Sequence, residues 1–349
     1  MTGPTMVWAI VLFLLGFAFL IKGGDWFVDG ATCIAKRYHV PELLIGATIV
    51  SIGTTLPEVM VSATAALQGS AGTSYGNAIG SVICNTALIS AITVAVRPSH
   101  VDVKTYLKPV LFFFATAIFY AVIAYTTGFF ARWTGIALLC VFVVYMVYSI
   151  WTGMRKPSLS TGEAAEEEDE EEGGSDFFGR FLRKVIPESA GLLVEIILLI
   201  AGAALIAVGA RLLVDNGTFI ARELGVPETV IALTFVALGT SLPELVTAVT
   251  ALIKGHGALS LGNVVGANLF NLVLVSGMAI TVSPFSIPAE KTFLSTGLNA
   301  SLVVDIPVMF AVMLLLTVPA LINGGKMRRW QGVTLLCIYA AFCVFQFCF

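Results

Sequence analysis

Charged residues are scarce in this sequence of 349 residues, because Asp, Glu, Lys and Arg make up only 12% of it. Soluble globular domains carry about 25% charged residues, so the composition excludes an ordinary soluble fold. Hydrophobic residues make up 58% of the chain, and its mean hydropathy is +0.94. These values indicate a membrane protein with several spans. The net charge of −3 says little about partners, because much of the acidity lies in one run at 165–172.

The sequence also lacks the residue patterns of common membrane enzymes and metal centres. It has only three histidines, all near predicted loops, and no HExxH motif. Its six cysteines lie in or beside apolar segments without the CxxC spacing of a metal site, which indicates buried free thiols. We therefore expect neither an enzyme nor a resident cofactor. No basic residue precedes the first apolar stretch, which we interpret as a retained span.

Apolar windows of about 20 residues, the length that crosses a bilayer as a helix, predict ten spans. Between the fifth and sixth lies a polar insertion at about 153–188 that contains the acidic run. We expect this linker to be solvated and disordered, the alternative being that it attracts cations. The predicted spans are 6–23, 42–68, 75–96, 108–128, 133–152, 190–214, 228–253, 260–282, 298–320 and 331–348.

The distribution of basic residues predicts the orientation, because Lys and Arg in short loops prefer the cytoplasmic side. With the N-terminus outside, only Arg132, Arg211, Arg222 and Lys291 of the 19 Lys and Arg residues lie outside. Both termini are therefore predicted to face outward and the acidic linker to be cytoplasmic.

The sequence repeats itself with an offset of 186 residues. VPELLIGATIVSIGTTLPE at 40–58 matches VPETVIALTFVALGTSLPE at 226–244, and YGNAIGSVICN at 75–85 matches LGNVVGANLFN at 261–271. Each half carries five spans, an odd number, so the second half must cross the membrane upside down relative to the first. Inverted repeats are typical of secondary transporters. The predicted division is a first repeat at 1–152 with its motif at 42–90, a linker at 153–188, and a second repeat at 189–349 with its motif at 228–276.

Pro57 and Glu58 interrupt the second predicted span. Proline lacks an N–H and its ring crowds the carbonyl four residues back, so we expect the helix to break and to free the carbonyls of 51–54. Such backbone survives at membrane depth only where it is buried in protein or lines a polar cavity. Thr54, Thr55 and Glu58 can share one helix face. Together with the carbonyls they form an all-oxygen set, which suits a hard cation such as Ca²⁺.

The second half repeats this chemistry around Pro243. The carboxylates are the informative residues, because an acidic side chain at mid-bilayer costs about 2.5–3.5 kcal/mol on translocon scales and is usually functional. Inversion should bring Glu58 and Glu244 together near the midplane. The neighbouring spans carry polar stripes, and in one of them Gly76 and Gly80 are predicted to allow close helix contact. The further polar candidates are Thr240 and Ser241 in the second break and Asn77, Ser81, Asn85, Asn263 and Asn271 in the stripes; for Asn77 and Asn263, ligation and helix packing remain open.

The paired motifs GTTLPE…GNAIGSVICN and GTSLPE…GNVVGANLFN resemble the two alpha-repeats of the cation/Ca²⁺ exchanger superfamily, most closely the prokaryotic sodium/calcium exchangers. The resemblance covers all ten spans in topology and about 60 residues per half in motif. It implies an all-α membrane protein of ten helices, with discontinuous helices 2 and 7 at the centre. It also implies an antiporter in a prokaryotic plasma membrane that exchanges Ca²⁺ for Na⁺ by alternating access, without cofactor, nucleic acid or obligatory protein partner.

The resemblance further implies the ion ligands, with Glu58 and Glu244 at the centre. Two positions depart from the family pattern, since Ala267 stands where Ser is expected and Asn271 where Asp is expected. The first change removes a possible Na⁺ ligand, and the second leaves two acidic groups and disfavours K⁺ co-transport. The remaining implied ligands are Ser51, Thr54, Thr55, Ser81, Asn85, Ala237 through its carbonyl, Thr240, Ser241 and Asn271.

The counter-ion stays open. Two carboxylates balance one Ca²⁺, two Na⁺ or two protons, whereas three Na⁺ would leave a positive charge in a low-dielectric site. The family favours Na⁺, while the charge count keeps Ca²⁺/H⁺ exchange open; a passive cation channel is the alternative from another class. In the family the first and sixth spans slide across the core. Their glycines indicate either a loose sliding interface or ordinary packing: Gly16, Gly23, Gly24, Gly202 and Gly209.

Overall fold

The computed structural model describes residues 3–155, 191–224, 239–288, 292–293 and 297–348. This part of the protein is almost entirely helical, and eight of its helical segments are long and apolar enough to cross a membrane. The expected all-helical, multi-span fold is therefore confirmed. The acidic run of the linker lies outside the described residues.

The first half of the chain forms helices joined by short turns, and two of its spans contain a π-helical segment. The elements are α1 (Gly3–Arg37), α2 (Glu42–Ile45), the π-helical segment Gly46–Val50, α3 (Ser51–Leu67), α4 (Ala71–Cys84), the π-helical segment Asn85–Ser90, α5 (Ala91–Val96), α6 (Val103–Thr127), β1 (Phe129–Phe130) and α7 (Arg132–Arg155).

The second half follows the same plan in its described part, with two antiparallel pairs of very short strands, β1 with β2 and β3 with β4. Its elements are α9 (Gly191–Glu223), α12 (Leu242–Ile253), α13 (Gly257–Phe270), the π-helical segment Asn271–Ser276, α14 (Gly277–Val282), β2 (Phe285–Ser286), β3 (Thr292–Phe293), β4 (Leu298–Asn299), the π-helical segment Ser301–Asp305, α15 (Ile306–Ile322) and α16 (Arg329–Cys348).

Nine of the ten predicted spans coincide with described helices, and the tenth, 228–253, is described only from residue 239. The helices of the first and sixth spans extend past the approximate predicted ends, 23 and 214, since α1 continues to Arg37 and α9 to Glu223. A hydropathy window stops at charged residues, whereas a helix continues where those charges find partners. Arg37, for example, makes a bidentate ion pair with Glu195 on α9, with its shortest contact at 2.7 Å.

The helix boundaries follow the 186-residue offset of the sequence. Helix α4 corresponds to α13, the π-helical segment Asn85–Ser90 to Asn271–Ser276, and α5 to α14, in each case residue for residue. The turns before α4 and α13 agree as well, since Gly69 and Gly255 both adopt left-handed backbone, with φ of +76° and +84°. The two motif regions therefore fold alike.

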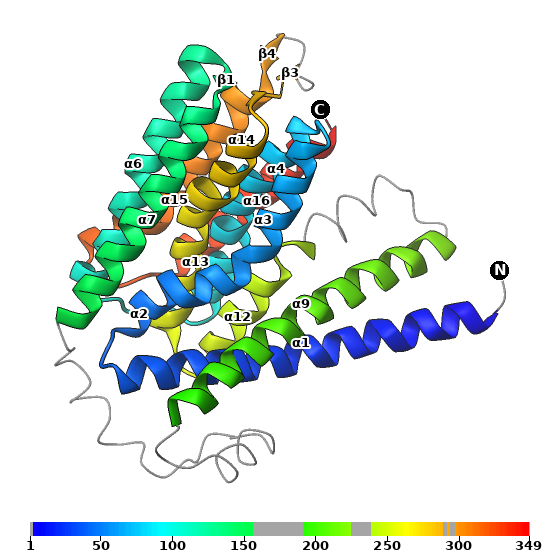
Figure 1. The fold of residues 1–349 in the computed structure, drawn as a ribbon, viewed down its shortest axis with the longest axis vertical. Coiled ribbons are helices and arrows are strands. Elements are labelled where there is room, and N and C mark those ends of the chain that lie inside the picture. Colours follow the sequence, from blue (N-terminus) through cyan, green and yellow to red (C-terminus); the bar gives the residue numbers. More distant parts are fainter. Residues whose placement is uncertain (1–2, 156–190, 225–238, 289–291, 294–296, 349) are drawn as a thin grey trace.

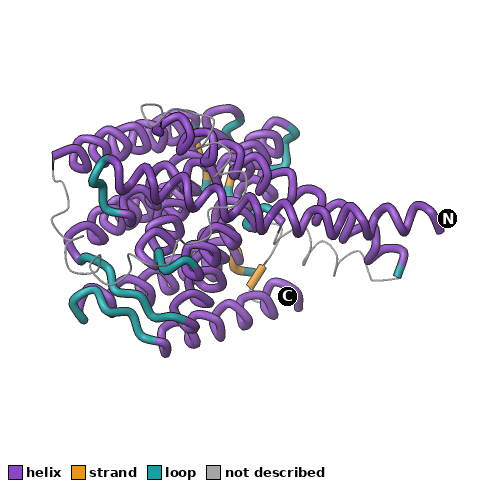
Figure 2. The backbone as a smooth tube through the Cα atoms, turned by 90° about the horizontal axis from the view of Figure 1, so that it is seen from below, coloured by secondary structure: helices purple, strands orange, loops and turns teal. Residues whose placement is uncertain are grey.

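Helices α1 and α9 lie side by side along one face of the bundle, and their ends near the N-terminus project beyond it (Figures 1 and 2). Their close approaches show that they run antiparallel, as equivalent helices of an inverted repeat must. A Cβ added at Gly16 would lie 2.9 Å from the Gly209 carbonyl oxygen, and one at Gly23 would lie 2.8 Å from that of Gly202. The glycines thus make a tight seam, which favours packing over a loose interface.

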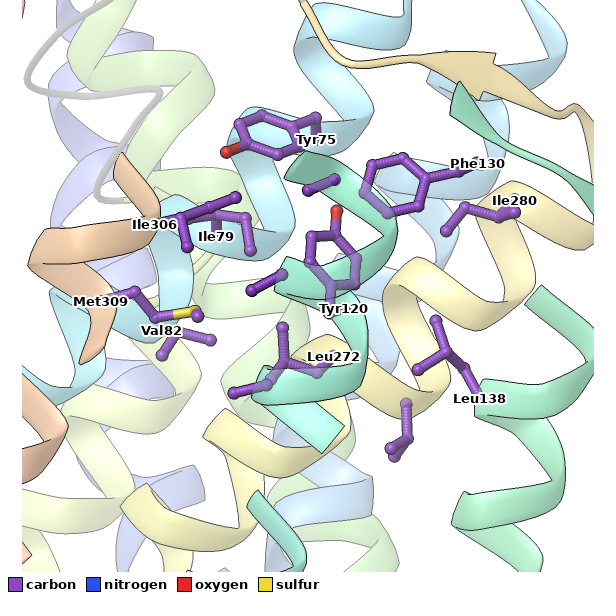
Figure 3. Packing of buried hydrophobic residues seen from close by; sticks show 14 of the residues in the cluster. Tyr75, Ile79, Val82, Tyr120, Phe130, Leu138, Leu272, Ile280, Ile306 and Met309 are labelled. Atoms are coloured by element: carbon purple, nitrogen blue, oxygen red, sulfur yellow. The ribbon is translucent and has the colours of Figure 1, made fainter. Parts of the chain in front are cut away.

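The largest cluster of buried hydrophobic residues in the described structure joins α4, α6, α7, α14 and α15 (Figure 3). Tyr75, Tyr120 and Phe130 are among its largest side chains and are at most 2% exposed. Tyr145 belongs to the same cluster, and its hydroxyl donates to the Ala47 carbonyl at 3.0 Å. Through this hydrogen bond, the cluster contacts the π-helical segment Gly46–Val50.

Candidate cation-binding site

The first half of the site lies on α3, where Ser51, Thr54, Thr55 and Glu58 are all at most 2% exposed. The structure corrects the position of the helix interruption, because α3 runs through Pro57 without a break. The irregular stretch is instead π-helical and lies earlier, at Gly46–Val50. Proline still removes one donor from the helix, but a single missing N–H can be tolerated when neighbouring helices hold the backbone.

The second half of the site lies at the start of α12, where the expected break at Pro243 is observed as a helix beginning at Leu242. Glu244 occupies the first turn and is fully buried. A carboxylate at this position is favoured by the partial positive charge of a helix N-terminus. Ser241 is buried and Thr240 is half-buried in the turn that precedes α12. Ala237 lies outside the described residues.

Two predicted ligand asparagines lie on segments that pack against the glutamate helices, the segment of Asn85 against α12 and that of Asn271 against α3. Asn85 and Asn271 are each the first residue of a π-helical segment, and both are fully buried. Neither amide has a hydrogen-bond partner in the described part of the chain. Ser81 and Ala267, one helical turn before them, are also buried. The two residues that depart from the family pattern, Ala267 and Asn271, are therefore both fully buried, one as an apolar side chain and the other as an amide.

The two halves meet through the hydroxyl of Thr55, which donates to Glu244 Oε1 at 3.4 Å. Both carboxylate oxygens of Glu58 and the second oxygen of Glu244 are buried without a hydrogen-bond partner among the described residues. An ionised carboxylate in such surroundings is very costly unless a positive charge pairs with it. Carboxylate, amide and hydroxyl oxygens are the ligands that hard cations prefer. The unpaired oxygens therefore fit a cation as cargo.

Among the described residues, the two carboxylates of the site do not belong to a larger cluster of acidic or metal-binding side chains. In the described part of the chain, no group of three or more His, Cys, Asp and Glu side chains could hold a metal ion. With only two carboxylates and otherwise neutral oxygens, the site suits an ion that must also leave.

The structure separates the two asparagines whose roles the sequence left open. The Asn77 amide donates to the Glu58 carbonyl at 3.2 Å and to the Ser62 hydroxyl at 2.8 Å, so it joins α4 to α3 as a packing residue. Asn263 instead faces the first repeat, since its side-chain oxygen lies 3.4 Å from the hydroxyls of both Ser51 and Thr54. Asn263 therefore joins the predicted site residues.

Glycines set the distance between α13 and the irregular segment of the first repeat. A Cβ at Gly266 would meet the Cα of Ala47 at 2.6 Å, and one at Gly46 would meet the Asn263 nitrogen at 2.8 Å. The predicted close contact at Gly76 and Gly80 is not observed, because a Cβ there would meet no atom within 4 Å in the described structure. Close packing between the two motifs is therefore made by Gly46 of the first and Gly266 of the second.

Helices α1 and α9 cover the site. Phe27 of α1 is 1% exposed, and its ring lies 3.0 Å from the position of a Cβ at Gly53. Ala203 and Ile206 of α9 lie beside Pro57 around a small cavity at the same place. Both glutamates are fully buried, so neither carboxylate is in contact with water in this structure.

The sequence analysis missed Thr247, which lies three residues after Glu244 on α12. Its side chain is fully buried, and its hydroxyl has no hydrogen-bond partner in the described part of the chain. Residues three apart share a helix face, so this hydroxyl lies on the same side of α12 as the Glu244 carboxylate. Its position three residues after Glu244 could have identified it. A search for polar residues shared by the two repeats does not, because the equivalent residue in the first repeat is Val61.

Replacing Thr247 with Val should affect the protein differently with and without ions. Without ions, an unsatisfied buried hydroxyl becomes a methyl group, so the Tm should stay the same or rise. With Ca²⁺, a ligand is lost, and the gain in Tm that Ca²⁺ gives should shrink. Thr134→Val is the matched control, because Thr134 is also fully buried and unpaired but lies on α7. Thermal unfolding measures the Tm of each variant without Ca²⁺ and the increase in Tm when Ca²⁺ is added. If Ca²⁺ raises the Tm of Thr247→Val as much as that of the unmodified chain, Thr247 is not part of the site.

Comparison with known proteins agrees with this geometry. The family described as "Sodium/calcium exchanger protein" matches residues 8–151 and 194–348. The sodium/calcium exchanger MaX1 of Methanosarcina acetivorans is 31% identical and covers 97% of this chain and 98% of its own length. The putative antiporter CaxA of Alkalimonas amylolytica is 32% identical, with 98% of each chain covered. The sodium-calcium exchanger NCX_Mj, soaked with 10 mM Na⁺ and zero Ca²⁺, superimposes with a TM-score of 0.77 at 32% identity, covering 96% of this chain and 98% of that one. The chain belongs to the sodium/calcium exchanger family.

Proposed function

We propose that the protein is a secondary active antiporter that exchanges Ca²⁺ for Na⁺ by alternating access. The observation that carries the proposal is the pair of fully buried glutamates, Glu58 and Glu244, with three carboxylate oxygens unpaired in the described structure. One divalent cation would balance the two charges. The similarity to MaX1 and NCX_Mj, both named as sodium/calcium exchangers, supports these ions.

The same pair of carboxylates gives a reason for obligatory exchange. A change of access without a bound cation would pass through a closed, low-dielectric state that contains two ionised glutamates. The free-energy cost of these unpaired charges opposes that change. Ca²⁺ and Na⁺ would compete for overlapping oxygen ligands and would each discharge the site. Only a loaded site would then change its side of access.

A second candidate is exchange of Ca²⁺ for protons, because the site contains only two acidic residues. Asn271 supplies an amide where the family resemblance expects a third carboxylate, and two protons would neutralise Glu58 and Glu244 directly. The two candidates differ only in the ion whose gradient drives Ca²⁺ transport, Na⁺ in the first and H⁺ in the second.

The discriminating experiment uses the purified full-length chain in sealed proteoliposomes and follows ⁴⁵Ca²⁺ uptake. Vesicles loaded with Na⁺ and diluted into Na⁺-free buffer should accumulate Ca²⁺, and dissipating the pH gradient with an ionophore should leave uptake unchanged. Uptake that follows a pH gradient and ignores Na⁺ would establish the second candidate. Flux down the Ca²⁺ gradient that ignores both counter-ions would indicate a channel.

We also propose that the N- and C-termini lie outside and the linker at 153–188 lies in the cytoplasm of a prokaryotic cell. The distribution of Lys and Arg supports this orientation. In a cysteine-free background, Ser175→Cys should react with an impermeant thiol reagent in inverted vesicles and not in right-side-out vesicles; the reverse pattern would invert the topology.

A further inference from the structure

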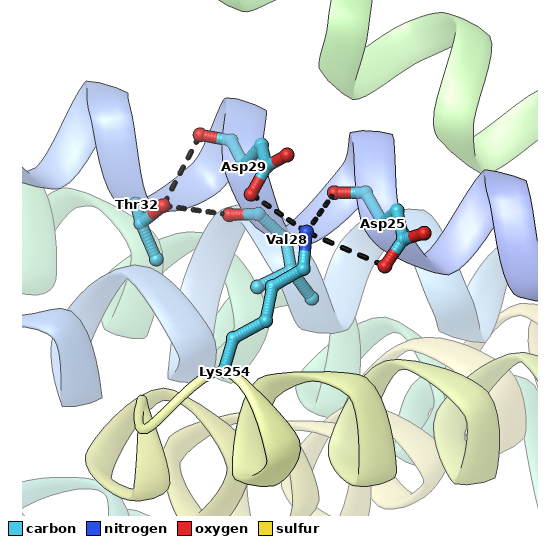
Figure 4. Close-up of polar contacts among 5 residues, drawn as sticks. All are labelled: Asp25, Val28, Asp29, Thr32 and Lys254. Carbon is cyan, nitrogen blue, oxygen red and sulfur yellow. Dashed lines mark hydrogen bonds and ion pairs between the residues drawn. The ribbon is translucent and has the colours of Figure 1, made fainter. Parts of the chain in front are cut away.

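Lys254 connects the turn between α12 and α13 to α1 (Figure 4). Its ammonium lies 2.8 Å from Asp29 Oδ1 and 3.4 Å from Asp25 Oδ1, and it donates to the Asp25 carbonyl at 3.1 Å. The three side chains are between 23% and 34% exposed, so the ion pairs are partly shielded from water. One cation thus joins a long helix that covers the site to the helix that carries Glu244.

The position of Lys254 on α12 places this contact away from the ion site. Glu244 lies in the first turn of α12, whereas Lys254 is the C-cap residue of the same helix. The contact therefore lies toward one face of the membrane, the face of the α12–α13 turn. A lysine at this end of a helix is also favoured by the partial negative charge of the last carbonyls.

The inverted repeat supplies an internal comparison for this contact. The 186-residue offset places Gln68 at the position of Lys254, and the turn around it has the same backbone, with a left-handed glycine next in sequence. Asp25 and Asp29 correspond to Arg211 and Asp215 on α9. Arg211 pairs with Asp215 on its own helix at 3.5 Å, with both side chains largely exposed. In the described structure, no ion pair or hydrogen bond joins α9 to Gln68.

The charges at these equivalent positions are therefore unequal. Two acidic residues face a lysine on one face of the membrane. At the equivalent positions of the other half, an acidic and a basic residue of α9 pair with each other, and an uncharged glutamine takes the place of the lysine. The bidentate pair between Arg37 and Glu195 joins α1 to α9. It therefore holds neither of these two helices to the rest of the bundle. Lys254 joins α1 to the end of α12 by ion pairs.

We propose that Lys254, Asp25 and Asp29 form a one-sided latch that holds α1 against the core at the α12–α13 turn. The latch biases the exchanger toward the state in which the ion site is closed on that face. This inference rests on the proposed alternating access, in which α1 and α9 move across the remaining helices. Moving α1 along α12 breaks the contacts of Lys254, while the corresponding movement at Gln68 breaks no ion pair. Because a two-state equilibrium shifts by the difference in free energy between its states, an ion pair made in only one state changes the population of both.

The test compares the two faces of the membrane in one protein. The apparent KM for Ca²⁺ on a face varies inversely with the fraction of molecules open to that face, so the ratio of the two KM values reports the equilibrium. Lys254→Gln, which copies the residue of the other half, should change this ratio by about three- to ten-fold, lowering the KM on the face of the α12–α13 turn. Lys254→Arg keeps the charge and should leave the ratio within about two-fold of the wild-type value. Right-side-out and inverted membrane vesicles give the two KM values.

A second variant transfers the latch to the other half. Gln68→Lys and Arg211→Asp, introduced together with Lys254→Gln, recreate the three charges around Asp215 on the opposite face. The new latch favours closure on the opposite face, so the KM ratio should move further in the same direction as in Lys254→Gln alone. A general loss of packing would lower the maximum rate on both faces without moving the ratio.

Two results overturn the latch. One is a ratio unchanged in Lys254→Gln, and the other is a transferred latch that moves the ratio back toward the wild-type value. Failure of the proposed function looks different, because wild-type vesicles would then show no counter-ion-driven Ca²⁺ uptake on either face. An active wild type with an unmoved ratio rejects the latch alone.

Discussion

Replacing Glu58 or Glu244 with Gln is expected to lower Ca²⁺ exchange by at least about 100-fold. Each substitution removes one of two charges that balance a divalent cation in a fully buried site. Loss of one partner from a buried charge pair costs about 3–5 kcal/mol, and each 1.4 kcal/mol corresponds to a tenfold change in affinity. Initial rates of Na⁺-driven ⁴⁵Ca²⁺ uptake in proteoliposomes measure the loss.

The same substitutions should leave the fold intact. Gln has the shape of Glu, and without bound ions it buries an amide in place of a costly carboxylate. The Tm without ions should therefore be equal to or higher than that of the unmodified chain. Glu42→Gln is the control, because Glu42 lies at the start of α2, partly exposed, beside His256 at 2.8 Å. Near-normal flux in Glu58→Gln or Glu244→Gln would place the ion elsewhere.

Replacing Gly266 with Ala should damage both stability and transport. The added methyl group would contact Ser51 and would lie 2.6 Å from the Cα of Ala47, so α13 must move away from the first repeat. Overpacking of this kind typically costs about 1–3 kcal/mol. The displacement would also separate Asn263 from the Ser51 and Thr54 hydroxyls. We expect a lower Tm and a several-fold higher KM for Ca²⁺.

The repeat supplies the control for Gly266. Its equivalent is Gly80, where an added Cβ meets no atom within 4 Å in the described structure. Gly80→Ala should therefore change neither the Tm nor the KM by a measurable amount. Equal damage from both substitutions would show that the two halves of the site are packed alike, contrary to the structure.

Much of the fold could be predicted because its strongest signals are local and repeated. The apolar windows located the spans, and the 186-residue offset predicted that α4 and α13 would match. The end of α1 could not be predicted from hydropathy, because Asp25 and Asp29 pair with Lys254 at the end of α12 and Arg37 pairs with Glu195 on α9. Those partners are distant in sequence, and only the fold brings them together.

The candidate site shows the same limit. A carboxylate beside a proline in an apolar span is informative by itself, so Glu58 and Glu244 could be found without a structure. The form of the interruption could not, because π-helical backbone at Gly46–Val50 depends on contacts such as that of Tyr145 with Ala47. Thr247 was hidden because the repeat places Val61 opposite it. Asn77 and Asn263 occupy equivalent positions yet make different contacts, a distinction that sequence cannot contain.

The most direct test of the central claim is a crystal of this protein soaked with Sr²⁺, a stand-in for Ca²⁺ with a usable anomalous signal. The account predicts one strong anomalous peak between Glu58 and Glu244, with oxygen ligands from both at about the 2.3–2.6 Å typical of Ca²⁺ or slightly longer. Added Na⁺ should weaken this peak. A peak that contacts neither glutamate, or a peak that Glu58→Gln leaves unchanged, would contradict the account.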